Sequence, residues 1–114
     1  MGRQIRKTYR GLNPSMLRDE VRGLLRKQGI AALETESKTY GLSSGATQSR
    51  ITLALQERGG PENQGQCGSV HILGSPRDET KMLLDVDEAL CPQERLSAFQ
   101  EDLEFVLGSY EMKW

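Results

Sequence analysis

The spacing of apolar residues predicts a helix near the start of the chain. Its stripe, at intervals of three and four residues, consists of Leu17, Val21, Leu24 and Leu25. Asn13 and Pro14 favour a helix start, because an asparagine side chain can cap a free backbone N–H and proline needs no partner at the first helical position. We expect this helix to end near Gln28, with Gly29 in the left-handed position that follows many helices.

A second apolar stripe predicts a helix at the end of the chain. Cys91 and Pro92 mark its start, again with proline at the first helical position. The stripe consists of Leu96, Phe99, Leu103, Val106, Leu107 and Tyr110. Because this stripe is the largest apolar surface in the chain, we expect the helix to be the main cover of a sheet.

Alternating apolar and polar residues predict five strands, at 4–12, 31–40, 50–56, 68–73 and 80–86. The clearest is 50–56, where Ile51, Leu53 and Leu55 alternate with smaller or polar residues. The first strand has basic residues on both sides, which is typical of a sheet edge. Residues 58–66 contain three glycines and one proline and predict a mobile surface loop.

These elements predict a single α+β domain over residues 1–114, in the order β-α-β-β-β-β-α. Short connections between successive strands favour an antiparallel sheet with both helices packed on one face. The other face is expected to stay open or to pair with a second copy. In element order the chain resembles the helix-grip folds, in which a long C-terminal helix lies across a curved antiparallel sheet, but it lacks their extra strands and second short helix.

Composition adds a reason to expect a partner. Hydrophobic residues make up 36% and aromatic residues 5% of the 114 positions, which indicates a thin core that an interface between subunits could extend. No apolar run is long enough to cross a membrane, and no secretory signal is visible, so we expect a cytoplasmic protein with no membrane partner. Cys67 and Cys91 do not have metal-site spacing and are interpreted as thiols.

Charge is divided between the two ends of the chain. Residues 1–30 contain eight basic and two acidic residues, and residues 77–114 contain four basic and ten acidic residues. This division predicts either polar partners or two ends that meet each other. In the first helix Arg18, Arg22 and Arg26 are spaced by four residues and share one face, which Lys27 extends. These four residues form a candidate site for an acidic partner. The net charge of −1 argues against nucleic acid as that partner.

Catalytic and metal-binding patterns are weak. The segment 41–45 fits G-x-S-x-G, but the residues after it predict a strand, so we interpret it as a hairpin turn. His71 is the single histidine and has no second ligand or base at a recognisable spacing. Asp85 and Asp87 share a strand face without the glycine-bearing loop of a calcium site. We therefore expect no cofactor, no metal and no enzymatic activity.

Three functions remain open at this point. The first is a non-catalytic protein-interaction module that self-associates and uses the basic helix face. The alternative is a carrier of small apolar ligands, with a helix-grip-like pocket between the sheet and the last helix. Its lining would be His71, Tyr40, Phe99, Leu103 and Tyr110. The third, an enzyme that uses His71 with a carboxylate, is the least supported.

Overall fold

A computed structural model describes residues 2–41, 43, 45, 47–57, 66–74, 79–87, 90–91 and 93–112. The loop predicted at 58–66 lies outside these residues except for its last position, Gln66, and so does Pro92.

Five strands form one antiparallel sheet, as the sequence predicts. They are β1 (Gly2–Arg10), β2 (Ile30–Gly41), β3 (Thr47–Glu57), β4 (Gly68–Gly74) and β5 (Glu79–Asp87). Their order across the sheet is β1-β5-β4-β3-β2, and every neighbouring pair is antiparallel. The first strand therefore lies at one edge, as expected, and pairs with β5 of the same chain. The opposite edge is β2.

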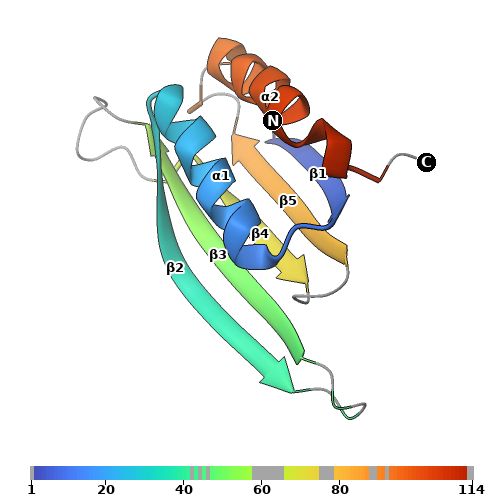
Figure 1. Ribbon diagram of the computed structural model, residues 1–114. Helices are drawn as coiled ribbons and strands as arrows, with labels where there is room; N and C mark the ends of the chain where they lie inside the picture. The colour runs from blue at the N-terminus through green and yellow to red at the C-terminus, as the bar shows by residue number, and fades with distance from the viewer. Residues whose placement is uncertain are drawn as a thin grey trace.

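Two helices cover the same face of the sheet, α1 (Pro14–Lys27) and α2 (Gln93–Leu107) (Figure 1). The Asn13 side chain accepts a hydrogen bond from the Met16 backbone N–H at 2.9 Å, and Gly29 has a φ of +76°. Both ends of α1 thus form by the predicted local chemistry.

The core lies between the helices and the covered face of the sheet. The alternating residues Ile51, Leu53 and Leu55 of β3 point into it and are buried. The α1 stripe contributes Leu17, Val21 and Leu25, and the α2 stripe contributes Leu96, Phe99, Leu103 and Leu107. The alternation on the strands and the helical spacing of the stripes therefore meet in one apolar layer.

The end of the α2 stripe differs from the prediction. The α-helix ends at Leu107, and a short 3-10 helix, η1 (Gly108–Tyr110), follows it. Val106 and Tyr110 are each 41% exposed, so the covered part of the stripe ends at Leu107. Because a 3-10 turn has three residues per turn instead of 3.6, it turns Tyr110 off the α-helical stripe.

No helix of the described residues covers the second face of the sheet. Thr52 of β3, His71 of β4 and Leu83 of β5 are cross-strand neighbours there and are partly exposed. An antiparallel sheet with one covered and one solvated face matches the expected arrangement. We refer to this second face as the open face.

The β2–β3 hairpin is longer than the rest of the sheet. Its outer part, residues 38–41 paired with residues 47–50, extends past both helices in Figure 1. Ser43 lies in the turn between these strands, which confirms that the G-x-S-x-G segment is a hairpin connection.

Candidate functional site

A surface groove runs between α1 and the first residues of β2. It has a volume of about 660 Å³. Its lining combines one side of α1 with one end of β2: Asp19, Arg22, Gly23, Arg26, Ile30, Ala31, Ala32 and Leu33. The groove therefore joins part of the predicted basic face to an edge of the sheet.

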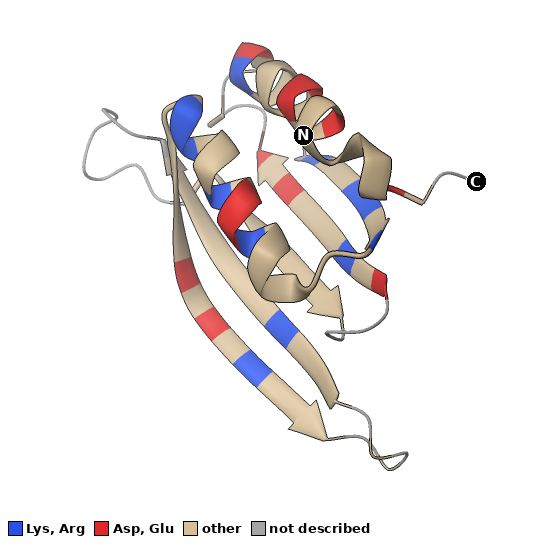
Figure 2. Cartoon of the chain, in the orientation of Figure 1, with Lys and Arg blue, Asp and Glu red and all other residues tan. Residues whose placement is uncertain are grey.

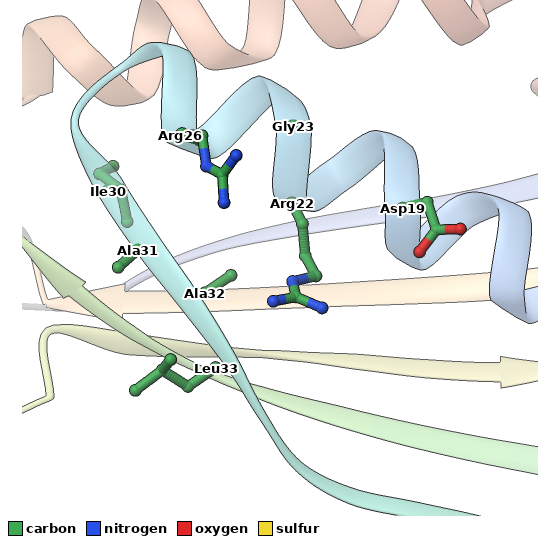
Figure 3. Close-up of a pocket in the computed structure, with 8 residues that line it drawn as sticks. All are labelled: Asp19, Arg22, Gly23, Arg26, Ile30, Ala31, Ala32 and Leu33. Carbon is green, nitrogen blue, oxygen red and sulfur yellow. The ribbon is translucent and has the colours of Figure 1, made fainter.

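Arg22 and Arg26 extend from α1 toward β2 and place two guanidinium groups in the groove (Figure 3). Both residues are exposed. Within the described residues, neither guanidinium forms an ion pair or a hydrogen bond with a carboxylate. Two arginines one helical turn apart can each bind a carboxylate with two parallel hydrogen bonds.

Arg18 is already engaged with acidic groups of its own chain. Its Nε donates to Asp19 Oδ1 and its Nη1 donates to Glu34 Oε1, both at 3.1 Å. The hydrogen bond to Asp19 is the main cause that raises the pKa of Arg18, although partial burial acts in the opposite direction. Arg18 therefore links α1 to β2, and it also occupies Asp19, the acidic residue of the groove.

Lys27 also has an acidic neighbour. Its Nζ lies 3.5 Å from Asp102 Oδ2 of α2, and the Gln28 amide donates to the same carboxylate oxygen at 3.4 Å. This contact joins the rims of the two helices. Of the four residues predicted to bind a partner, Arg22 and Arg26 are thus the two with free guanidinium groups among the described residues.

Small side chains keep the groove open. Gly23 faces it from α1, and a Cβ atom built on Gly23 would meet no atom within 4 Å. Ala31 and Ala32 line the β2 side. The arginines were predictable from the sequence but these small residues were not, because the approach of β2 to α1 depends on tertiary packing. The one feature of the sequence that indicates this approach is the predicted strand that directly follows the basic helix.

The basic start and the acidic end of the chain meet within one molecule. Lys7 Nζ of β1 lies 2.7 Å from Glu104 Oε1 of α2 and 3.2 Å from Glu111 Oε1. Arg3 donates to the Gln100 side chain at 2.7 Å. Figure 2 shows the basic residues of β1 and the acidic residues of α2 on neighbouring elements. Part of the charge division is therefore paired within the chain itself.

The residues proposed for an apolar ligand are not brought together. Phe99 and Leu103 belong to α2, and both side chains are fully buried in the core. His71 and Tyr40 lie on the open face, on the other side of the sheet. Tyr110, in η1, lies close to Gly11. These five side chains therefore do not line one shared cavity.

His71 lies between two hydroxyl groups. Its Nδ1 is 3.4 Å from Thr52 Oγ1, and its Nε2 is 3.3 Å from Ser69 Oγ. In the part of the chain that the structure describes, no three or more His, Cys, Asp or Glu residues cluster as metal ligands. The same residues include no helix with the length and apolar character needed to span a membrane.

No protein-family model, curated protein or solved structure matches this chain.

Proposed function

We propose that this protein is a non-catalytic interaction module that self-associates and that binds an acidic segment of a protein partner in the groove between α1 and β2. The observation that carries the second part is the pair of guanidinium groups of Arg22 and Arg26, which have no carboxylate partner among the described residues and lie over a groove whose lining includes Gly23, Ala31 and Ala32.

The groove suits a carboxylate-bearing chain for two reasons. First, its cationic groups lack the internal partners that Arg18 and Lys27 have among the described residues. Second, β2 is the last of the five described strands, and within this part of the chain no strand pairs with the outer side of its backbone beside the groove. A sheet edge offers backbone hydrogen bonds to an extended partner, and nearby side chains select among partners.

The carrier alternative has less support. Its proposed apolar lining, Phe99 and Leu103, is filled by core packing, and its proposed polar groups lie across the sheet. A ligand pocket needs apolar walls and polar groups that converge on one space.

Selection of peptides from a random display library tests the acidic-partner proposal. The wild-type protein is expected to enrich peptides rich in Asp and Glu. Their affinity should fall at least tenfold in the double variant Arg22→Glu and Arg26→Glu, because both charges that meet the peptide are reversed. Binding of each enriched peptide is measured by fluorescence polarisation at low and high salt.

A matched control carries the same change in net charge at the other edge of the sheet. The exposed residues Arg6 and Arg10 of β1 are replaced by Glu, and peptide affinity is expected to stay within about twofold of wild type if binding is local. Enriched peptides without acidic residues, or equal losses in both double variants, would refute the groove as the site.

A further inference from the structure

The outer edge of β2 is long, and no strand among the described residues pairs with it. β2 has 12 residues, and it is the last strand in the sheet order. From Leu33 to Gly41 every described residue except Glu36 is exposed. A long exposed edge is a template for pairing with another strand, and proteins usually cover it or break it.

The sequence of this edge is complementary to itself. In an antiparallel pair of two β2 strands related by a two-fold axis at Ser37, Glu36 of each copy lies opposite Lys38 of the other. A β-bulge between Glu34 and Glu36 adds one residue, Thr35, on this stretch. The extra residue shifts the register so that Leu33 lies opposite Tyr40 of the second copy.

These four residues lie on the same face of the sheet. In the β2–β3 ladder, Leu33, Glu36, Lys38 and Tyr40 are paired with Ala54, Thr52, Arg50 and Gln48. Those β3 residues alternate with the buried Ile51 and Leu53 and thus belong to the open face. Both the charge pair and the apolar pair would therefore form on one side of the joined sheet, as cross-strand pairing requires.

Lys38 has an unfavourable neighbour in the single chain. Its cross-strand partner is Arg50, and the Arg50 Nε lies 3.9 Å from Glu36 Oε1. Among the residues that the structure describes, Lys38 forms no ion pair. Glu36 of a second copy would supply the missing carboxylate, and the two-fold axis would form this contact twice.

The ends of the same stretch carry exposed apolar side chains. Leu33 is 50% exposed and Tyr40 is 42% exposed. An aromatic residue opposite an aliphatic one is a favourable cross-strand pair that removes apolar surface from water. The two-fold register is thus supported at its centre by charge and at both ends by apolar contact.

We infer that two copies of this chain join through β2 in an antiparallel pair centred on Ser37, which makes one continuous ten-stranded sheet from two five-stranded ones. This inference rests on the self-association in the proposed function and specifies its geometry. It uses the edge of β2 from Leu33 to Gly41. Leu33 also lines the groove, whereas Arg22 and Arg26 belong to α1.

Charge exchange across the two-fold axis tests the register. Lys38→Glu alone and Glu36→Lys alone are each expected to raise the dimer dissociation constant about tenfold, because both symmetric pairs become like-charge pairs. The double variant, Glu36→Lys with Lys38→Glu, is expected to restore most of the affinity. Light scattering behind size exclusion and sedimentation across a concentration series give these constants.

Lys81→Glu is the matched control. Lys81 is an exposed lysine of β5 on the open face, away from the β2 edge, and its reversal is expected to leave the dimer unchanged. Hydrogen exchange gives a second readout, in which protection of the β2 amides falls on dilution of the wild type while that of β4 does not.

The outcomes separate the two proposals. A wild type that stays monomeric at all concentrations overturns both self-association and the β2 dimer, but leaves the acidic-partner groove to its own test. A wild-type dimer that the single variants do not weaken, or that the double variant does not restore, overturns this register alone.

Discussion

Gly68 and Gly23 differ in the space around them, and this difference predicts opposite effects of alanine. A Cβ atom on Gly68 would lie 2.6 Å from the Asp85 carbonyl oxygen and 2.7 Å from Val86 Cγ1 of the neighbouring strand, whereas one on Gly23 would meet nothing. We expect Gly68→Ala to lower the free energy of unfolding by about 1–3 kcal/mol. Gly23→Ala should raise it by about 0.5–1 kcal/mol, since alanine favours helix. Urea unfolding of both variants measures these changes in the free energy of unfolding. Changes of the same sign would contradict the difference in free space between Gly68 and Gly23.

Tyr9 is a buried residue whose hydroxyl group is unpaired in the part of the chain that the structure describes. Its ring is 1% exposed, and its Oη has no hydrogen-bond partner among the described residues. Removing a buried, unpaired polar group while keeping the ring costs no interaction. Tyr9→Phe is therefore expected to leave the free energy of unfolding unchanged or to raise it by up to about 1 kcal/mol. A loss of more than about 1 kcal/mol in urea unfolding would mean that the hydroxyl has a stabilising partner.

At the scale of elements, the start of α1 depends on one side chain. The Asn13 side chain satisfies the Met16 N–H, one of the donors that an α-helix leaves free at its start. Asn13→Ala is expected to lower the free energy of unfolding by about 1 kcal/mol. Asn13→Ser should retain most of the stability that the cap provides, because a serine hydroxyl can accept the same hydrogen bond. Thermal unfolding of both variants makes the comparison. Equal losses would show that the cap contributes little.

The elements also show what could be predicted from sequence. The strand ladder was predictable because alternation such as Ile51, Leu53 and Leu55 reports burial on one face. The extent of β2 was also predicted to within one residue at each end, but the start of β3 was not, because residues 47–49 are polar and their strand conformation depends on pairing with β2. The end of α2 at Leu107 was missed for a similar reason, since the helical spacing continues through a 3-10 turn.

The candidate site was predictable only in part. Helical spacing was enough to place Arg18, Arg22 and Arg26 on the β2 side of α1, whereas Lys27 contacts Asp102 of α2. Which of them are free depends on acids that come from distant elements: Glu34 of β2 engages Arg18, and Asp102 of α2 engages Lys27. Such contacts follow from tertiary packing, so the sequence could indicate a basic face but not the groove that Arg22 and Arg26 line.

At the scale of the whole molecule, the two ends of the chain are joined by charge. Lys7 of β1 has two carboxylate neighbours from the C-terminal region, Glu104 and Glu111. Burial of the lysine lowers its pKa, but hydrogen bonds to these carboxylates outweigh that effect, and the pKa of Lys7 lies above its ordinary value of 10.5. Burial, aided by the same two carboxylates, also raises the pKa of Tyr9 above its ordinary 10.0.

Both shifts predict a loss of stability in alkali. The unfolded chain releases the Lys7 and Tyr9 protons near their ordinary pKa values, while the folded chain retains them. Below the unfolded-state pKa, each shift contributes its full amount to the free energy of unfolding. This contribution is lost as the pH rises through the pKa that the group has in the folded chain. We expect the free energy of unfolding, measured with urea from about pH 8 to about pH 11, to fall above about pH 10.

Lys7→Met should be less stable than wild type near pH 8 and should show a shallower alkaline fall, because the carboxylates lose their cation and the lysine titration is absent. Lys81→Met, at an exposed lysine with no ion pair among the described residues, should follow the wild-type profile. If Lys7→Met and Lys81→Met give the same profile, the contact between the two ends of the chain does not set the stability of the fold.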